Sequence, residues 1–311
     1  MPNLSTFRES LLSQPGYTLM RGIARFSTVR AVVVGARKLV QRGRLSSYQA
    51  ERESRLLATT FPGVNRARFI EALVGDGAAF GLVLPAQVVK EIFDWAASAT
   101  CFADREPNLG FDLPDRHKAE AALGKRILLA QYFNVTTECP VIRRLAADPL
   151  LESIAGHYLG SVPRLVGANL WWTFPVKASV EDRERHAHLF HRDVDDFRFM
   201  KYFFYLTDVN ESDGAHVCVL GSHEKPPKVS IGNQWKLRRY SDEEIWAAYE
   251  ATNIKEICGP AGMGFAENTL CIHKARTPTS RPRLMLQLQY ALYDYGVAHD
   301  RRDPESLTRI I

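Results

Sequence analysis

The sequence has neither a long apolar run nor a regular cysteine pattern. No apolar run approaches the roughly 18–20 residues that a helix needs to cross a bilayer. The first twelve residues mix Arg8 and Glu9 with polar groups, unlike a secretory signal. The five cysteines are an odd number without a C-x-x-C pair, which argues against a disulfide framework or a zinc site and favours small buried side chains. We therefore expect a cytoplasmic protein.

Acidic residues are rare in the N-terminal part of the chain. Residues 10–50 contain no Asp or Glu, and residues 1–50 carry eight Lys or Arg against one acid. The net charge of +5 arises from this segment, because the other residues sum to −2 (+5 minus +7). A positive excess confined to one arm does not indicate nucleic-acid binding. We expect no nucleic-acid partner.

Residues 1–50 are predicted to form a basic, helical arm. Its apolar residues recur at three- and four-residue steps, which is typical of an amphipathic helix. They are Leu19, Ile23, Phe26, Val29 and Val33. Most such helices pack on protein, either on their own domain or on a partner chain. The alternative is peripheral contact with an anionic membrane through residues 19–44. An organelle transit peptide has a similar composition.

Residues 51–311 are predicted to form a single domain, because no repeat, low-complexity tract or linker interrupts them. The whole chain is 46% hydrophobic, which suffices for a large core. Within this domain, residues 51–160 are expected to be a helical layer. The expected helices begin at Pro85, run from Pro114 to about Tyr132, and run from Pro149, after Asp148 as N-cap, to Gly160.

Residues 161–311 are predicted to be a strand-rich core. Short β-rich stretches follow one another, separated by turn signals such as Ser212-Asp213-Gly214. One helix interrupts them, where Ser241 and Glu244 form a capping box. The predicted strands are Arg164–Phe174, Arg198–Asp208, His216–Leu220, Gly264–Ala266, Thr269–Ile272 and Arg283–Leu292. Helices followed by many short strands favour an α+β fold with a jelly-roll or β-barrel core.

The most informative motif is His191-Arg-Asp193. Side chains two residues apart on a strand face the same way, so His191 and Asp193 can present an imidazole and a carboxylate to one point. One further histidine would complete the two-histidine, one-carboxylate arrangement that leaves positions open for non-haem Fe(II) chemistry. His273, beside an expected strand, stands out for this place. Ten residues later Arg283 begins an alternating strand, where its planar fork can clamp a dicarboxylate.

These residues resemble the phytanoyl-CoA dioxygenase family, a branch of the iron- and 2-oxoglutarate-dependent oxygenases. The resemblance is carried by His191-Arg-Asp193, Tyr205-Leu-Thr-Asp-Val209, Asp213-Gly214, Gly221-Ser-His223, and the stretch from His273 through Arg283 to Tyr290. It implies a double-stranded β-helix core with Fe(II), 2-oxoglutarate and O2. It also implies that residues 191, 193 and 273 hold the metal and that Arg283 pairs with the far carboxylate of 2-oxoglutarate.

The chain departs from the family at one position. The family arginine commonly lies eleven residues past the distal histidine, where this chain has Leu284. If the loop after His273 is one residue shorter than in the family, Arg283 takes the place of the family arginine. Arg283 directly adjoins the alternating strand, and Arg281 is the other candidate for binding 2-oxoglutarate. Related halogenases replace the carboxylate with a small residue, whereas Asp193 is retained. The resemblance thus implies a dioxygenase that hydroxylates or desaturates a small or medium-sized organic substrate and releases succinate and CO2.

Further residues are predicted to line the cavity. The family resemblance implies that Phe203 lies near the co-substrate, and Lys201, on the same strand face, and Asn169 are also expected there. His188, Trp171, Thr173 and Arg276 are expected near the substrate. Two alternatives stay open. One is a jelly-roll binding protein without turnover, and the other is a cupin-type enzyme that uses His186, His188 and His191 without 2-oxoglutarate.

Overall fold

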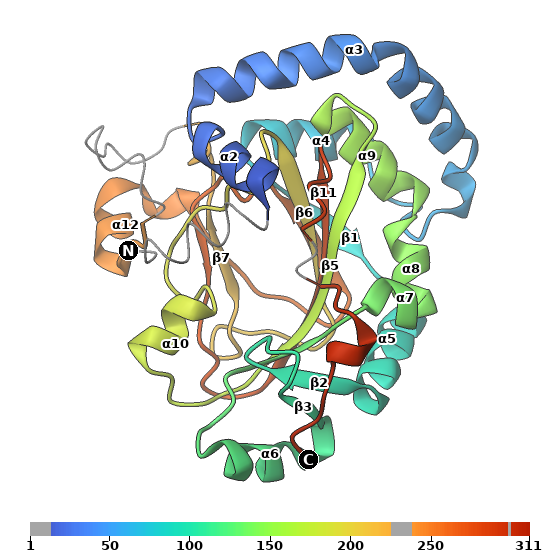
Figure 1. Cartoon of the computed structure of the whole chain (residues 1–311). Helices are drawn as coiled ribbons and strands as arrows, with labels where there is room; N and C mark the ends of the chain where they lie inside the picture. Colours follow the sequence, from blue (N-terminus) through green and yellow to red (C-terminus); the bar gives the residue numbers. More distant parts are fainter. Residues whose placement is uncertain (1–13, 225–237, 298–299) are drawn as a thin grey trace.

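The computed structural model describes residues 14–224, 238–297 and 300–311, which form two antiparallel sheets covered by helices (Figure 1). The large sheet has eight strands in the order β1-β9-β6-β11-β5-β4-β2-β3, and the small sheet has the order β10-β7-β8. The strands of the large sheet are β1 (Ala78–Val83), β2 (Thr100–Ala103), β3 (Gly110–Asp112), β4 (Leu129–Tyr132), β5 (Arg164–Thr173), β6 (Phe199–Tyr205), β9 (Met263–Glu267) and β11 (Arg283–Ala291). Those of the small sheet are β7 (His216–Val219), β8 (Ile254–Ile257) and β10 (His273–Ala275).

The two sheets face each other across an inner core. This core joins side chains of β5, β6, β9 and β11 to those of β7 and β8. The arrangement confirms the predicted α+β class with a double-stranded β-helix core. No helix within the described ranges is both long and apolar enough to cross a bilayer.

Helices cover the outer face of the large sheet. They are α3 (Ser27–Ser54), α4 (Arg66–Gly75), α5 (Ala86–Ser98), α7 (Val135–Glu138), α8 (Pro140–Ala146) and α9 (Pro149–Leu159) (Figure 1). Of the others, α2 (Pro15–Ile23) contacts the loop before β6, α6 (Arg116–Leu123) lies beside β3, and α10 (Val180–Arg185) and α12 (Asp242–Ala248) lie beside the small sheet. Asp148 caps α9 by accepting from the amides of Leu150 and Leu151, and Gly160 ends it with φ +67°. The capping box of Ser241 and Glu244 is also present at α12.

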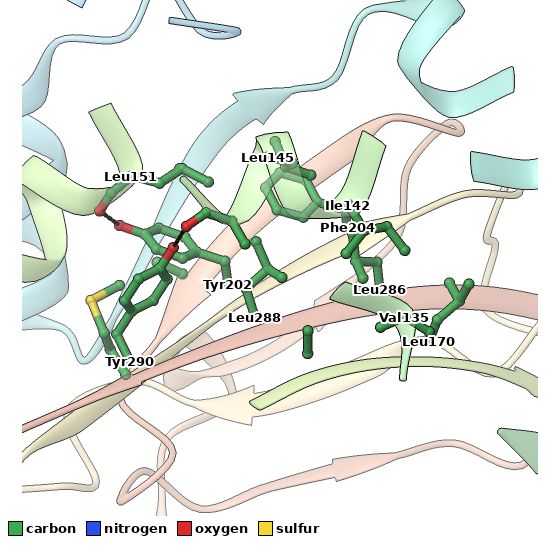
Figure 2. Packing of buried hydrophobic residues seen from close by; sticks show 14 of the residues in the cluster. Val135, Ile142, Leu145, Leu151, Leu170, Tyr202, Phe204, Leu286, Leu288 and Tyr290 are labelled. Atoms are coloured by element: carbon green, nitrogen blue, oxygen red, sulfur yellow. Dashed lines mark hydrogen bonds between the residues drawn. The ribbon is translucent and has the colours of Figure 1, made fainter. Parts of the chain in front are cut away.

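Alternation along β11 separates its two faces. Leu286, Leu288 and Tyr290 face the helices, and Figure 2 shows them beside Tyr202 and Phe204 of β6. The side chains that meet them from α7, α8 and α9 are Val135, Ile142, Leu145 and Leu151. Burying each large apolar side chain stabilises the fold by roughly 1.5–3 kcal/mol. The Tyr202 hydroxyl also donates to the Leu151 carbonyl at 2.8 Å. This layer covers one face of the sheet, and the opposite face of β11 lines the site.

The predicted helical layer is wrong in part. Residues 51–160 contain four strands, β1 to β4, which extend the large sheet on both sides. The helix expected from Pro114 to Tyr132 ends at Leu123, because Gly124 adopts φ +63° and the chain then enters β4. All four residues of β4 are buried, so their pattern lacks the alternation that marks a strand with one solvent-facing side.

The strand predicted at Thr269–Ile272 is also wrong. These residues form a turn. The amide of Cys271 donates to the carbonyl of Asn268, and the amide of Leu270 donates to the side-chain oxygen of Asn268. The strand begins at His273 instead. Strand β8, in which Ile257 alone is buried, was not predicted.

The N-terminal arm consists of two helices instead of one, with a break at residues 24–26. Helix α3 packs on α9, where Gln49 donates to the Ser153 carbonyl at 3.1 Å and accepts from the Ser153 hydroxyl at 2.8 Å. Figure 1 shows α3 arching over α9 and α4. The arm therefore packs on the body of the protein, with Val33 and Val34 against the core.

Candidate metal centre

A cavity of about 330 Å³ opens between the two sheets. Its walls come from β4, β5, β6 and β11 of the large sheet, from β7 and β10 of the small sheet, and from the loop before β6. Ligand sites commonly measure roughly 300–1,000 Å³, so the cavity has the size of a small-molecule site. Its lining mixes aromatic, amide and charged side chains.

His191, Asp193 and His273 meet at one point of this cavity. One ligand atom from each lies within 4.8 Å of the others, and among the described residues this is the one such group of three or more His, Cys, Asp or Glu. Backbone hydrogen bonds fix the arrangement. His191 and His273 exchange amide–carbonyl bonds of 2.9 and 3.0 Å, and the Asp193 amide donates to the Thr269 carbonyl at 2.8 Å. The two segments are thus clamped together although 82 residues separate the histidines.

Both histidines present the same ring nitrogen to the centre. The Nδ1 of His191 lies 2.9 Å from the Leu189 carbonyl, and that of His273 lies 2.9 Å from the Cys271 carbonyl. Because a carbonyl only accepts, each Nδ1 donates a proton to it, and the lone pair of a neutral ring is then on Nε2. The Nε2 atoms lie 3.6 and 3.5 Å from the two carboxylate oxygens of Asp193. Burial lowers the pKa of His191 well below its usual value, which keeps its imidazole neutral and able to bind a metal.

Lys201 holds the second oxygen of Asp193. Its Nζ lies 2.7 Å from Asp193 Oδ2 and 3.1 Å from Asp195 Oδ2. Burial alone raises the pKa of Asp193, but Lys201 and the two histidines outweigh it and bring the pKa well below the usual range. The carboxylate therefore stays ionised. Its Oδ2 lies between Lys201 and Nε2 of His273, and its Oδ1 faces Nε2 of His191.

Two residues behind His273, His216 and Glu267, support its ring. The ring of His216 stacks on that of His273, with centroids 5.5 Å apart and an interplanar angle of 16°. Its Nε2 lies 2.7 Å from Glu267 Oε2, in a pair with almost no exposure to solvent. Burial raises the pKa of Glu267 to about 8 and lowers that of His216 to about 3, so both groups are neutral near pH 7. A neutral hydrogen-bonded pair can fix the orientation of His273 without adding charge.

Arg283 lies in the same cavity, at the start of β11, with 1% of its surface exposed. Its guanidinium donates to the Gly214 carbonyl and, at 3.3 Å, to the Thr173 hydroxyl. The remaining Nε is buried and has no partner among the described residues. A buried donor without an acceptor is costly, so this nitrogen fits an anion bound in the cavity.

Arg281 is engaged elsewhere. Its guanidinium pairs with Asp213 at 2.7 Å, about half of its side chain is exposed, and it does not line the cavity. Gly214, next to Asp213, adopts φ +84°, and a β-carbon there would lie 2.8 Å from Pro278 Cγ. The Asp213-Gly214 turn thus holds Arg281 outward by a carboxylate and Arg283 inward by a carbonyl. Of the two arginines, only Arg283 reaches the cavity.

Comparisons with known proteins bear on the fold. No protein-family model and no curated protein sequence matches the chain. Among solved structures, the epimerase SnoN in complex with Fe3+, α-ketoglutarate and nogalamycin RO matches with a TM-score of 0.50 and 19% identity, over 75% of this chain and 87% of SnoN. HygX from Streptomyces hygroscopicus, with nickel and 2-oxoglutarate bound, matches with a TM-score of 0.49 and 13% identity, over 72% and 86%.

This chain has the fold of SnoN. Identities this low establish the fold and nothing of the substrate, and the narrower resemblance to the phytanoyl-CoA dioxygenase family stays a prediction.

The other predicted site residues divide into two groups. Asn169, Phe203, Lys201, Trp171 and His188 line the cavity. Two do not. Thr173 lies behind the wall as the hydroxyl that accepts from Arg283. Arg276 lies outside, where it pairs with Glu256 at 3.0 Å, so the structure does not support its predicted contact with substrate.

Several cavity residues were missed in the sequence. Gln287 and Gln289 lie on the face of β11 that carries Arg283, opposite the helices, so the strand alternation could have identified them. Glu267 has no such signal, because it lies at the end of a short strand and becomes relevant only through its contact with His216. Arg105 comes from a loop between β2 and β3, and nothing in its local sequence marks it.

Proposed function

We propose that the protein is a non-haem Fe(II)- and 2-oxoglutarate-dependent dioxygenase of the phytanoyl-CoA dioxygenase type, acting on a small or medium-sized organic substrate. The observation that carries the proposal is the meeting of His191, Asp193 and His273 in the cavity that also contains Arg283. These four side chains come from two segments, residues 191–193 and 273–283, that lie far apart in the sequence.

The residues of the cavity fit both groups that the proposal requires, a metal ion and 2-oxoglutarate. Two neutral imidazoles and one carboxylate are the facial ligand set of non-haem Fe(II) enzymes, and such a set leaves positions open. For 2-oxoglutarate, the unpartnered Nε of buried Arg283 supplies a charged donor of the required kind. When bound, the metal and its co-substrate supply the activation of O2 and the oxidation of a C–H bond.

The protein itself supplies positioning, charge and exclusion of water. The Nε2 atoms of His191 and His273 and one oxygen of Asp193 would hold the metal, while Lys201 keeps the second carboxylate oxygen and favours binding through one oxygen only. Arg283 would hold the far carboxylate of 2-oxoglutarate. The rings of Phe203 and Trp171 give an apolar wall beside the centre, which limits the access of water.

The reaction that we propose is hydroxylation or desaturation. In hydroxylation, 2-oxoglutarate, O2 and a substrate C–H give succinate, CO2 and the alcohol, so one oxygen atom enters succinate and the other the substrate. The retained Asp193 supports oxidation over halogenation, because a halide would need the coordination position that the carboxylate takes. The substrate in this proposal is a small molecule, and the proposed location of the protein is the cytoplasm.

Succinate formation tests this proposal. Purified protein incubated with Fe(II), 2-oxoglutarate and O2 is expected to release succinate slowly even without substrate, because many such centres consume co-substrate uncoupled. The Asp193→Ala variant and a sample with excess chelator are the controls, and both should release none. Equal succinate release by the variant would contradict the proposal.

The three-histidine alternative is not assembled in the structure. His186 Nε2 lies 3.2 Å from Asp104, and His188 Nδ1 lies 2.8 Å from the Thr277 hydroxyl. Neither joins His191 in the group of ligand atoms. Binding without turnover is the remaining alternative, and the succinate assay distinguishes it directly.

We also propose peripheral membrane contact by the outer face of α3. Val32, Leu39 and Val40 are 70–75% exposed on this face, with the exposed cations Lys38 and Arg42 beside them and no acid between residues 10 and 50. An apolar stripe flanked by cations suits an anionic lipid surface.

Liposome sedimentation tests this contact. Vesicles containing phosphatidylserine are expected to bind the protein, whereas neutral phosphatidylcholine vesicles are not. A Leu39→Glu/Val40→Glu variant should bind at least about 10-fold more weakly, because it loses buried apolar area and gains repulsion. Val180→Glu on α10, at a position that is 66% exposed, is the matched control. Unchanged binding by the α3 variant would refute the contact.

A further inference from the structure

Arg105 is a cavity residue that the proposed function does not use. It lines the same cavity as the metal centre, yet Arg283 already provides the cation for the co-substrate. Among the described residues, no hydrogen bond or ion pair engages its guanidinium. The side chain keeps contact with solvent. Surrounding protein atoms nevertheless lower the pKa of Arg105 by burial, and the charge of Asp193 opposes this by raising it. Arg105 is thus a free cation held within electrostatic range of the metal centre.

The backbone at this position is strained. Asp104 and Arg105 have φ values of 54° and 65°, in the left-handed region that non-glycine residues rarely occupy. Such conformations persist only where the surroundings enforce them, and they cluster at ligand sites. Here Asp104 is the anchor: it is 5% exposed, its amide donates to the Leu129 carbonyl, and its carboxylate accepts from Lys125 at 2.5 Å. The anchored turn places Arg105 in the cavity wall.

A second strained residue lies in the same wall. Ala187 has φ 63° and also lines the cavity. Its neighbour His186 contacts Asp104 at 3.2 Å, so one buried pair ties the two strained segments together. The carbonyl of Ala187 further accepts from the Ala275 amide, two residues past the distal histidine. The loop that holds Arg105 is therefore connected to the strand that holds His273, which sets the position of Arg105 relative to the metal centre.

The charge of the cavity favours an anionic ligand. Its cations are Lys201, Arg283, Arg105 and Arg302, and its acids are Asp193 and Asp195. Lys201 pairs with both acids, and the four cations exceed the two acids, so the lining carries a net charge of +2 (+4 minus 2). With Arg283 assigned to the co-substrate, Arg105 has no counter-charge of its own.

We propose that Arg105 binds a carboxylate or phosphate group of the organic substrate, and that the substrate class is organic anions. This inference rests on the proposed function, because the same cavity must hold 2-oxoglutarate. The planar guanidinium can bind either group through two parallel hydrogen bonds, which fixes the substrate's orientation as well as its charge. Arg105 is accordingly a specificity-determining residue.

The test compares organic acids with their neutral amides. The protein is loaded with Zn(II) and 2-oxoglutarate so that no turnover occurs, and benzoate, hexanoate, their primary amides and phenyl phosphate are titrated by calorimetry. The wild type is expected to bind at least one anion at least 10-fold more tightly than its neutral counterpart. Comparison of benzoate with phenyl phosphate distinguishes carboxylate from phosphate recognition.

Variants assign the preference to one side chain. Arg105→Gln should abolish the preference, Arg105→Lys should keep only part of it, and Arg301→Gln, an exposed arginine outside the cavity, should behave as wild type. Thermal unfolding of each variant checks the fold. The proposal is overturned if the wild type shows no preference for anions, or if the preference survives Arg105→Gln.

The outcomes also separate this inference from the proposed function. Binding of 2-oxoglutarate to the Zn(II)-loaded protein is titrated in parallel, and it should be unchanged in Arg105→Gln. If the wild type binds 2-oxoglutarate but shows no preference for anions over amides, only the proposed role of Arg105 is contradicted. Absence of 2-oxoglutarate binding by the wild type removes the proposed function itself.

Discussion

Asp193→Ala is expected to lower the affinity for Fe(II) at least about 100-fold and to abolish succinate formation. The variant removes one of three candidate ligands, whereas loss of a mere supporting contact around a metal typically costs 10- to 100-fold. It also leaves Lys201 facing two imidazoles without the carboxylate that lies 2.7 Å from its Nζ. An ammonium at that place repels a cation, so the loss should exceed that from the missing ligand alone. Equilibrium dialysis with metal analysis measures the effect.

Asp195→Ala is the matched control for this prediction. Asp195 also contacts Lys201, at 3.1 Å, and lines the same cavity, but it does not belong to the group of ligand atoms. Its substitution is expected to change the Fe(II) affinity less than about 5-fold. Equal losses in the two variants would show that the cavity's charge, and not direct ligation by Asp193, determines metal binding.

Arg283→Gln is expected to weaken the binding of 2-oxoglutarate about 100-fold or more. A charge-assisted hydrogen bond contributes roughly 1.5–3 kcal/mol, and the variant loses both the Nε donor and the buried positive charge, so a cost of about 3 kcal/mol is expected, which corresponds to about 100-fold in Kd. Glutamine keeps a donor for the Gly214 carbonyl but lacks the charge and the fork. Calorimetric titration of the metal-loaded protein gives Kd directly.

Arg281→Gln separates the two candidate arginines. Arg281 pairs with Asp213 on the outside of the turn, so its substitution should leave Kd for 2-oxoglutarate within about 3-fold of wild type. The reverse ranking, with a large loss in Arg281→Gln and none in Arg283→Gln, would assign the co-substrate to the other arginine. Thermal unfolding must accompany both titrations, because Arg283 is buried and holds the Gly214 turn.

The sequence predicted the part of the site that follows from strand geometry. The alternation after Arg283 depends only on side chains pointing to opposite faces of strand β11. The same rule, extended along β11, would have added Gln287 and Gln289 to the cavity. Periodicity therefore carries information about any strand that has one apolar and one polar face. The strand expected at His191 and Asp193 is wrong: both lie in the loop before β6, and their meeting with His273 depends on the backbone bonds to residues 273 and 269.

Buried strands and loop residues could not be predicted from the sequence, for a different reason. Strand β4 is buried on both faces, so its apolar run is equally compatible with a helix. The turn before His273 depends on a side-chain bond of Asn268, which an apolar run such as Leu270-Cys271-Ile272 conceals. Arg105 reaches the cavity through two residues in the left-handed region and an anchor from a distant histidine. These features arise from tertiary contacts and leave no pattern in the local sequence.

The most direct measurement is a crystal structure of the protein grown without oxygen in the presence of Mn(II) and 2-oxoglutarate. We expect the metal to be bound by Nε2 of His191, Nε2 of His273 and one oxygen of Asp193. We also expect the 2-oxoglutarate to chelate it and to place its far carboxylate on Arg283. Metal bound by His186 and His188, or a co-substrate that leaves Arg283 without a ligand, would contradict the account.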